Sequence, residues 1–590
     1  MIWKADTLHQ RFVETETGTI KKDWTGRIKV ALIYPNRYAV GMSNLGFQAV
    51  YHLLNRIDHV VCERAFLPEK NTSATRRVTT IETGSFISDF DIVAFSFSFE
   101  NDYPNLLTIL DRERLPLWSS DRGTPHPLLI AGGVACFLNP EPIAPFIDCF
   151  LIGEAEAILP RFFDTSLFDL LEMDRASCLE TLAQNIPGTY VPAFYRPEYT
   201  RDGTLLAFEP TADVPTTIKR VFVNNLSESP CCSTVLTPET SFERTFLIEV
   251  GRGCPHGCRF CASGYIYRPP RFRSLSLLSE CLQRGASLTD RIGLVGAAVS
   301  DLPGITRLCE RVDPDNVRLS FSSLRADALS NELIAVLKKN RVKTATIAPD
   351  AGSERLRNVI NKGLTETDIL KAAENLVSAG IPNLKLYFML GLPTEMPEDV
   401  DAIVELCKKV KHNFLKSSRT RKRIGEISVS ISSFVPKPFT PFQWVAMEDM
   451  QTLKKKIKKV KSGLKRVSNV TVHADVPRWA YIQALFSRGD RKVAQVLSLA
   501  HDNQGNWPKT FKASPANTDF YVYRKRALEE LLPWDFIDHG IEKSFLAKEY
   551  RRALQNKTSP PCPMKSCNLC GVCETENDKT GIERDVRPKI

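Results

Sequence analysis

Three cysteines on one short loop constrain this chain more than any other feature. Cys254, Cys258 and Cys261 stand in the run GCPHGCRFCA, with the spacing C-x3-C-x2-C. Thiolates are the usual ligands of iron–sulfur clusters, so three of them can hold three irons of a 4Fe–4S cluster and leave the fourth open. An open position is typical of a catalytic metal site. From the spacing alone, a zinc knuckle completed by His256 is the alternative.

The residues before the loop favour an α/β barrel. Residues 246–250 are apolar and predict a short buried strand, and Gly251 and Gly253 predict the turn that ends it. Barrel enzymes place their chemistry where strands pass into the loops that follow them. The three cysteines therefore occupy the position at which a barrel enzyme carries out catalysis.

Length and composition indicate a multidomain protein without secretion or membrane signals. A chain of 590 residues is too long for one core. It begins without an apolar signal segment and contains no apolar stretch long enough to span a bilayer, so we expect a cytoplasmic protein with no membrane partner. Sixteen cysteines in such a chain favour metal sites and buried thiols over disulfides.

Alternating strand and helix signals run through the first part of the chain. Strands are predicted at 28–34, 91–97, 127–131 and 150–153, and Asn44 is placed to cap a helix that ends near residue 55. This rhythm is typical of a Rossmann-like open parallel sheet, which binds ligands at the carboxyl ends of its strands. The loops at those ends are 35–46, 98–102, 132–135 and 153–156.

The alternation resumes after the cysteines. Strands are predicted at 246–250, 292–295, 317–320, 344–347, 384–389 and 426–431, and helices at 328–340 and 365–379. This pattern favours a partial α/β barrel. We therefore expect an α/β protein with a Rossmann-like domain at 1–165, a proline-rich extension at 166–240, a barrel at 241–475 and a small, mostly helical module at 476–590.

Several motifs resemble the radical S-adenosylmethionine (radical SAM) superfamily, in which the open iron binds the amino and carboxylate groups of S-adenosylmethionine. The cysteine loop carries the resemblance, and a Rossmann-like domain ahead of it is similar to the cobalamin-binding subgroup. The phrases YPNRYAVGMSNLG (34–46), FSFSFEN (95–101), IAGG (130–133) and NPEP (139–142) resemble largely uncharacterised members of that subgroup. Their histidine motif D-x-H-x-x-G is absent here, so cobalamin binding and a degenerate, substrate-binding or packing domain both stay open.

The resemblance also implies residues that contact the cofactors. The run GLVGAAVSD (293–301) stands where the family has a Gly-Gly-Glu element, but without the glutamate, so the expected contact moves to backbone atoms near Gly296 and Ala297. Further cofactor contacts are expected from Phe260 in the loop, from SFSSLR (320–325), from APDAGSE (348–354) and from MLGLPTE (389–395). The side chains implied are Ser320, Ser322, Arg325, Asp350 and Glu354, with Gly391 in the last phrase.

A second cysteine cluster stands near the C-terminus. Cys562, Cys567, Cys570 and Cys573 have the spacing C-x4-C-x2-C-x2-C. Four thiolates close a coordination sphere, so we expect a structural or electron-relaying site, with zinc and a second iron–sulfur cluster as the alternatives. A metal here would stabilise a module too small to have a large core of its own.

The net charge of +10 comes from 78 basic and 68 acidic residues, and the excess is concentrated in two lysine-rich runs. Residues 408–423 and 452–466 carry it, and the second run predicts a helix with Leu453, Ile457, Val460 and Leu464 on one face. A solvated helix face is one interpretation, and a surface for an anionic partner such as RNA is the other.

Together these features predict a radical SAM enzyme. A 4Fe–4S cluster at the three-cysteine loop would cleave S-adenosylmethionine reductively and modify an unidentified substrate, by methyl transfer if cobalamin binds. A one-electron reductant of the flavodoxin or ferredoxin type is the expected partner. The alternatives are an RNA-modifying, methylthiotransferase-like enzyme and, in another class, a non-catalytic iron–sulfur or zinc scaffold.

Overall fold

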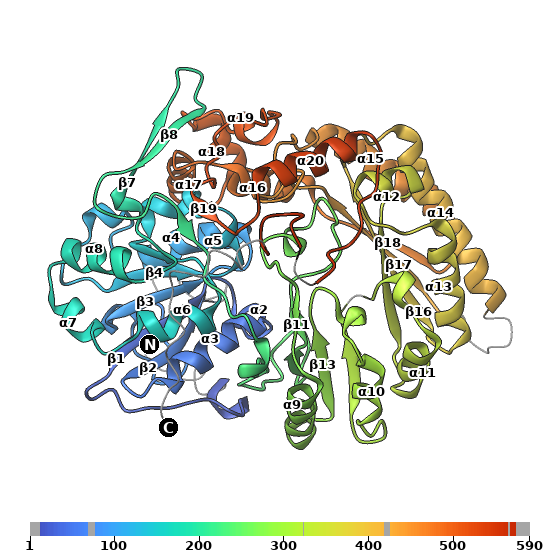
Figure 1. The fold of residues 1–590 in the computed structure, drawn as a ribbon, viewed down its shortest axis with the longest axis horizontal. Helices are drawn as coiled ribbons and strands as arrows, with labels where there is room; N and C mark the ends of the chain where they lie inside the picture. Colours follow the sequence, from blue (N-terminus) through green and yellow to red (C-terminus); the bar gives the residue numbers. More distant parts are fainter. Residues whose placement is uncertain (1–11, 69–76, 323, 418–424, 565–566, 574–590) are drawn as a thin grey trace.

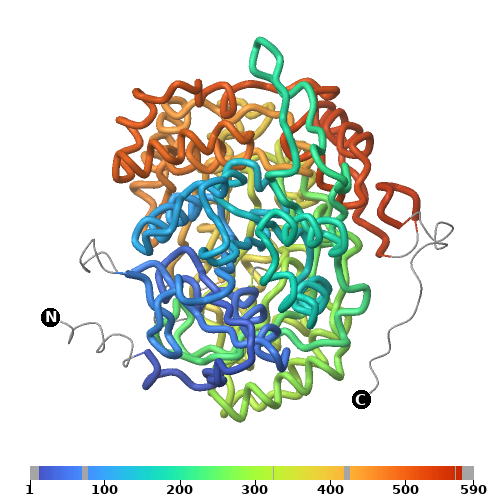
Figure 2. The backbone as a smooth tube through the Cα atoms, turned by 90° about the vertical axis from the view of Figure 1, so that its left-hand side faces the viewer, coloured from blue at the N-terminus to red at the C-terminus, as the bar shows by residue number. Residues whose placement is uncertain are grey.

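The computed structural model describes residues 12–68, 77–322, 324–417, 425–564 and 567–573. Two α/β units lie side by side, the N-terminal one in blue and cyan and the barrel in green and yellow (Figure 1). Helices of the C-terminal part lie across the top of both units in this view. Figure 2 shows the ribbon of β7 (Tyr195–Tyr199) and β8 (Leu205–Pro210) projecting from the same end.

The N-terminal unit contains the open, mainly parallel sheet that the sequence predicts, with six strands where four were predicted. Its strand order is β2-β1-β3-β4-β5-β6, and all neighbours are parallel except β5 and β6. The strands are β1 (Ile28–Tyr34), β2 (Val60–Phe66), β3 (Ile92–Ser96), β4 (Leu128–Gly132), β5 (Cys149–Leu151) and β6 (Thr189–Tyr190). The order reverses between β1 and β3, and such a switch point is where ligands bind in open parallel sheets.

The helices of this unit connect the strands and cover the sheet. They include α3 (Leu45–Arg56), α4 (Tyr103–Arg112), α6 (Ala155–Phe162) and α8 (Arg175–Asn185). Asn44 caps α3 as expected, because its side chain accepts a hydrogen bond from the backbone N–H of Phe47.

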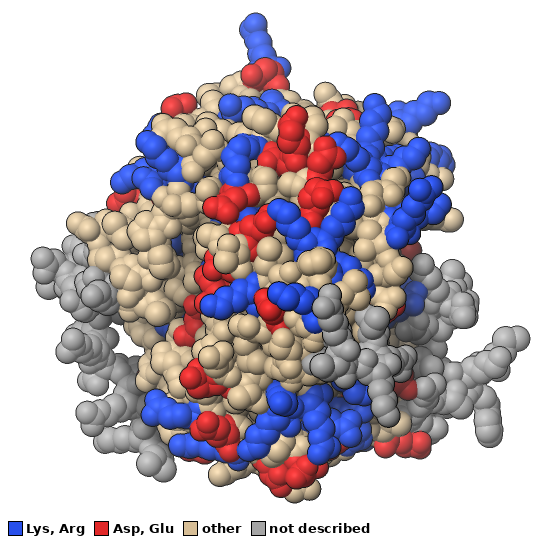
Figure 3. Space-filling model, turned by 90° about the vertical axis from the view of Figure 1, so that its right-hand side faces the viewer, with Lys and Arg blue, Asp and Glu red and all other residues tan. Residues whose placement is uncertain are grey.

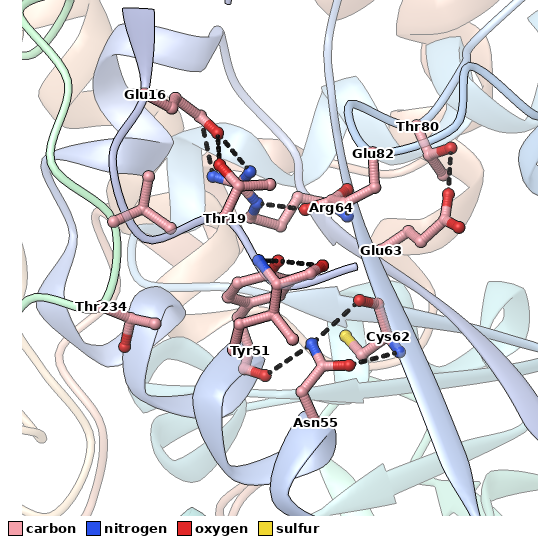
Figure 4. Close-up of polar contacts among 12 residues, drawn as sticks. Glu16, Thr19, Tyr51, Asn55, Cys62, Glu63, Arg64, Thr80, Glu82 and Thr234 are labelled. Atoms are coloured by element: carbon pink, nitrogen blue, oxygen red, sulfur yellow. Dashed lines mark hydrogen bonds and ion pairs between the residues drawn. The ribbon is translucent and has the colours of Figure 1, made fainter. Parts of the chain in front are cut away.

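The edge strand β2 was not expected from the sequence, because it contains two charged residues. All seven of its residues are buried, including Glu63 and Arg64. The Arg64 guanidinium lies 2.6 Å from the Glu16 carboxylate and 2.7 Å from that of Glu82 (Figure 4). A buried strand usually has an apolar sequence, and this one keeps its charges because each has a buried partner.

The second unit is the predicted partial barrel, made of two parallel sheets. The first contains β10 (Phe246–Glu249), β13 (Arg291–Val295) and β14 (Arg318–Phe321). The second contains β15 (Thr344–Asp350), β16 (Asn383–Leu390), β17 (Ile427–Ser433) and β18 (Val470–Ala474). Helices between the strands include α9 (Leu275–Leu288), α11 (Asn331–Lys339), α13 (Glu366–Ser378), α14 (Pro397–Ser417) and α15 (Met450–Leu464).

The lysine-rich helix α15 is amphipathic as predicted. Leu453, Ile457, Val460 and Leu464 are buried, and most of its lysines are exposed. Figure 3 shows basic and acidic side chains interspersed over the right-hand face of the molecule. The end of the first lysine-rich run, at 418–423, lies outside the described residues.

The C-terminal part is mostly helical. It contains α16 (Pro477–Arg488), α17 (Val493–Asp502), α18 (Trp507–Ala513), α19 (Thr518–Val522) and α20 (Lys543–Leu554). A short strand, β19 (Ile537–Asp538), pairs in parallel with β9 (Ile218–Lys219) from the extension after the first unit. In the described part of the chain, no helix is both long and apolar enough to cross a bilayer.

Candidate functional site

A small hairpin that follows β10 brings the two ends of the three-cysteine loop together. β11 (Gly251–Arg252) pairs antiparallel with β12 (Arg271–Phe272), so residues 253–270 form a closed loop at the barrel mouth. Gly253 has φ 78°, and a Cβ there would lie 2.7 Å from the carbonyl oxygen of Tyr267. A side chain at this position would force the loop apart, so glycine is required by both conformation and space.

The three thiols are neighbours within this loop. Cys258 is buried, and Cys254 and Cys261 are partly exposed. The pKa of Cys254 is raised to about 12, mainly by burial and in part by the nearby thiols of Cys258 and Cys261. Among the described residues, no three or more Cys, His, Asp or Glu side chains already converge as a ligand set. The donor set nevertheless fits a cluster, since metal binding displaces thiol protons and orders its ligands.

Two cationic side chains surround the buried thiol. Burial raises the pKa of Cys258, whereas the charges of Lys362 and Arg325 lower it. The Lys362 ammonium lies 2.6 Å from the carboxylate of Asp350. The Arg325 guanidinium pairs with Asp327 at 2.8 Å and donates to the backbone oxygen of Lys362 at 3.1 Å. The charge of Arg325, which was predicted from the sequence, thus favours an anionic cluster at Cys258, whereas Asp350, also predicted, pairs with Lys362 and raises the pKa of Cys258.

Asp301 lies beside the histidine of the three-cysteine loop. His256 Nε2 lies 2.8 Å from Asp301 Oδ1, so the histidine of the loop engages a carboxylate. The second oxygen, Oδ2, is buried and has no hydrogen-bond partner in the part of the chain that the structure describes. The charge of Asp301 also acts on Cys254 and on Arg325. A buried carboxylate oxygen without a partner is costly, so Oδ2 can accept a hydrogen bond from a ligand or from water.

A hydrogen bond between predicted serine and glycine positions links the ends of β13 and β14. Ser322 Oγ donates to the backbone oxygen of Gly296 at 2.9 Å, and Ser320 Oγ donates to that of Ile292 at 3.3 Å. Ala297 is exposed in the turn that follows Gly296. Gly296 and Ser322 are therefore brought together, whereas Ser320 satisfies its hydroxyl within the sheet.

The remaining predicted positions lie farther from the thiols. Glu354 is half exposed at the start of α12 (Glu354–Val359), and its carboxylate accepts from the backbone of Glu366 on α13. Gly391, with φ 82°, donates its N–H to the carboxylate of Glu395 at 3.1 Å. Phe260 packs against the hydrophobic core of the barrel. None of the three has a described contact with the cysteine side chains, so their predicted cofactor contacts remain predictions.

A cavity of about 360 Å³ lies between the two units. All four predicted loops of the N-terminal sheet contribute to its lining. Its apolar floor comes from the ends of β1, β3, β4 and β5, namely Leu32, Ala94, Ile130 and Leu151. Glu249, Arg252 and Gly296 line it from the barrel, so the cavity reaches the strand ends that carry the cysteine loop. It is the size of a typical ligand site and lies at the topological switch point between β1 and β3.

Arg252 holds the two units together at the rim of this cavity. Its guanidinium lies 2.5 Å from Glu156 and 3.1 Å from Glu154 of the first unit, and 2.9 Å from Glu249 of the barrel. Such a multiple charge-assisted contact fixes geometry as well as contributing energy. Arg252 was not predicted from the sequence, although its place between the two glycines before Cys254 was a usable signal.

The four C-terminal cysteines line a second cavity of about 170 Å³. Gly257 and Tyr265 of the three-cysteine loop line the same cavity. The two cysteine clusters are therefore adjacent, a relation that their separation in sequence did not predict.

Comparison with known proteins identifies the two units. Residues 46–192 match the family model of the N-terminal region of radical SAM proteins, and residues 248–407 match the model of the radical SAM superfamily. The uncharacterised protein MJ0966 of Methanocaldococcus jannaschii is 32% identical over 527 residues, which cover 88% of this chain and 98% of that protein.

Two more distant proteins are similar to this chain, one in part of its sequence and the other in its structure. A tRNA-2-methylthio-N(6)-dimethylallyladenosine synthase of Carboxydothermus hydrogenoformans is 24% identical over 204 residues, 32% of this chain and 46% of that protein. The solved structure of TsrM, a radical S-adenosylmethionine methyltransferase from Kitasatospora setae with cobalamin and a [4Fe-4S] cluster bound, covers 83% of this chain and 100% of its own. It matches with a TM-score of 0.47 and 13% identity.

The matching family models coincide with the unit that carries the cavity floor and with the barrel that carries Cys254, Cys258 and Cys261. The chain therefore belongs to the radical SAM superfamily and is an enzyme that uses S-adenosylmethionine and a 4Fe–4S cluster.

Proposed function

We propose that this enzyme binds cobalamin in the cavity between its two units and transfers a methyl group from S-adenosylmethionine to a carbon of its substrate. The observation that supports this most directly is the cavity of about 360 Å³ at the β1/β3 switch point, which reaches the strand ends of the barrel. When bound, the reduced 4Fe–4S cluster supplies an electron that breaks a carbon–sulfur bond of S-adenosylmethionine, and cobalamin supplies a carrier for methyl groups.

The lining of the cavity fits such a cofactor. Its apolar floor suits an aromatic base, and the charged rim of Glu154, Glu156 and Arg252 suits the amide side chains of a corrin ring. No histidine is among the described residues that line it, so these residues offer no imidazole to the lower face of cobalt. This agrees with the absence of the D-x-H-x-x-G motif.

The protein's own residues would bind and orient S-adenosylmethionine beside the cluster loop. Asp301 Oδ2 would accept hydrogen bonds from the methionine ammonium, in the role of the missing glutamate. Arg325 and Lys362 would hold negative charge close to Cys258. The Ser322 hydroxyl fixes the backbone of Gly296, which faces the cavity. We place this chemistry in the cytoplasm, because all sixteen cysteines are unpaired, as a reducing compartment keeps them.

Cobalt quantification tests the proposal. Protein purified anaerobically from cells supplied with cobalamin should contain about one cobalt per chain and show corrinoid absorbance. Ala49→Trp fills the cavity from α3, and cobalt should then fall at least about tenfold, whereas Ala176→Trp on the exposed face of α8 should retain it. Cobalt that is absent from the wild-type protein, or equal in the two variants, would overturn the proposal.

A second candidate is modification of RNA, and two observations favour it. The partial relative from Carboxydothermus hydrogenoformans acts on tRNA by its name, and α15 presents a lysine-rich face. RNA binding through this face should weaken steeply with salt, because it would release counterions from the phosphates. If Lys454→Glu/Lys458→Glu leaves the affinity for bulk tRNA unchanged at low salt, this candidate fails.

A further inference from the structure

The C-terminal cysteines lie directly against the back of the three-cysteine loop. The backbone N–H of Cys562 donates to the carbonyl oxygen of Pro255 at 2.7 Å. Pro255 is bonded to Cys254, so one hydrogen bond and a short stretch of backbone join a cysteine of one cluster to a cysteine of the other. Figure 1 shows the red C-terminal segment descending to the centre of the molecule, above β11.

Two further links hold the clusters in contact. Arg259, fully buried next to Cys258, donates to Glu549 on α20 at 3.1 Å and to the backbone oxygen of Lys557 at 2.7 Å. Asn361 donates to the backbone oxygen of Gly257 at 3.0 Å and accepts from the backbone N–H of Ser559 at 2.7 Å. The segment that leads to Cys562 is therefore fixed to both sides of the loop.

The four cysteines line a cavity of about 170 Å³ together with residues of the three-cysteine loop and of α20. Four thiolates suit either zinc or an iron–sulfur cluster. The direct contact with the three-cysteine loop is what favours a redox-active centre at this position.

A buried cation faces two of these thiols. The Arg268 side chain is 6% exposed, and its Nε donates to the backbone oxygen of Gly264 at 2.7 Å. The guanidinium lies over the rings of Tyr265 and Phe545, and the nearby thiols of Cys570 and Cys562 contribute to raising its pKa. The described ion pairs include no carboxylate partner for Arg268. A buried charge requires compensation, and a site with four thiolates would supply it.

We propose that Cys562, Cys567, Cys570 and Cys573 hold a second iron–sulfur cluster that delivers electrons to the cluster at Cys254, Cys258 and Cys261. An external low-potential, one-electron reductant is oxidised at the tail cluster, and the electron passes to the loop cluster. There it reduces the sulfonium of S-adenosylmethionine, which yields methionine and a 5′-deoxyadenosyl radical. This relay rests on the cleavage of S-adenosylmethionine and is independent of whether cobalamin binds.

Metal analysis of matched variants tests the tail site without any assay of activity. Cys567→Ser/Cys573→Ser and Cys254→Ala/Cys258→Ala/Cys261→Ala should each lose about half of the iron and sulfide of the wild-type protein. Cys309→Ala removes a buried cysteine from α10 (Ile305–Glu310) and should lose none. Zinc at the tail, or iron that depends on the loop cysteines alone, would overturn the proposal.

A comparison of reductants tests the relay. With dithionite, which can reduce the loop cluster directly, the tail variant should form 5′-deoxyadenosine at nearly the wild-type rate. With a flavodoxin or ferredoxin as the electron donor, the rate should fall at least about tenfold. Equal rates with the protein donor would refute the relay. If the wild-type protein forms no 5′-deoxyadenosine with dithionite, cleavage of S-adenosylmethionine is refuted instead. The conclusion from the iron measurement would still hold.

The midpoint potential provides a test that preserves the ligands. Arg268→Met removes a buried positive charge, so the tail cluster should become harder to reduce and its potential more negative. Lys548→Met removes an exposed charge beside the same cavity and should shift the potential far less, because solvent screens it. Equal shifts in the two variants, or a shift in the loop cluster alone, would contradict the assignment of Arg268 to the tail site.

Discussion

The two cysteine clusters differ in how the fold supports them. The three-cysteine loop is fixed by its own strand β10 and by the β11/β12 hairpin. The four-cysteine segment lies beyond the end of α20 and has no helix or strand among its described residues. Its support comes from backbone hydrogen bonds of Cys562 to Pro255 and of Glu542 to Cys570, and from the contacts that Arg259 and Asn361 make with the residues just before it. A site that must keep one coordination position free needs a preset frame, whereas a site that closes its coordination can be shaped by the metal itself.

The largest expected effect comes from removing the ligands of the three-cysteine cluster alone. Cys254→Ala/Cys258→Ala/Cys261→Ala removes every thiol ligand of the open site, so formation of 5′-deoxyadenosine should fall below detection. The fold should survive, because the strands and the hairpin do not depend on these side chains. Circular dichroism and thermal unfolding of the anaerobic protein check the fold, and a loss of the barrel would show that the loop is a structural scaffold instead.

The next largest expected effect comes from breaking the contact between the two clusters. Arg259→Met leaves the buried carboxylate of Glu549 with only its longer contact to Arg552 at 3.9 Å, which should lower the free energy of unfolding by about 3 kcal/mol. Arg551→Met, on the exposed side of α20, should cost less than about 0.5 kcal/mol. Urea denaturation measures both, and similar costs would show that Arg259 does not support the tail.

A smaller effect should appear only at the open site. Asp301→Asn weakens an acceptor for the methionine ammonium, so the Kd for S-adenosylmethionine should rise about 10- to 100-fold, or about 1.5–3 kcal/mol. Asp290→Asn changes an exposed carboxylate just before the opposite end of β13 and serves as the control. Calorimetry on the reconstituted protein distinguishes them, and an unchanged Kd in Asp301→Asn would assign the ammonium to another acceptor.

The smallest expected effect is on stability, and it concerns only the segment that leads to Cys562. Ser559 Oγ donates to the Glu549 carboxylate at 2.8 Å, so Ser559→Ala should lower the free energy of unfolding by about 1 kcal/mol. Thr558→Ala changes the exposed neighbouring hydroxyl and should have almost no effect. Differential scanning calorimetry measures both. Equal melting temperatures for Ser559→Ala and the wild-type protein would contradict the role of Ser559 in fixing the segment.

The sequence predicted features that depend on local pattern. The strand at Ile28–Tyr34 and the cap at Asn44 were predicted because apolar periodicity and a capping side chain act over a few residues. The fold class and the radical SAM chemistry are confirmed by the two family models and by the relative that is 32% identical. The predicted domain boundaries remain predictions.

Features that depend on distant partners were missed. β2 was missed because its Arg64 is neutralised by Glu16 and Glu82, which come from other parts of the chain. Asp301 was not predicted as a contact, since only the fold turns its free oxygen inward beside His256. The contact between Pro255 and Cys562 joins positions about 300 residues apart, and no local pattern reports it.

The pairing of β9 with β19 has a consequence for synthesis of the chain. It joins Ile218 to Ile537, which are 537 − 218 = 319 residues apart. At about 5–20 residues per second, a ribosome needs roughly 16–64 s to cover that interval. During this time the strand from the extension has no partner, and Arg259 has not yet met Glu549. Arg259 and Glu549 are 549 − 259 = 290 residues apart, so the cysteine loop stays uncovered on the nascent chain for roughly 15–58 s, which gives iron–sulfur assembly a period of access before the tail docks.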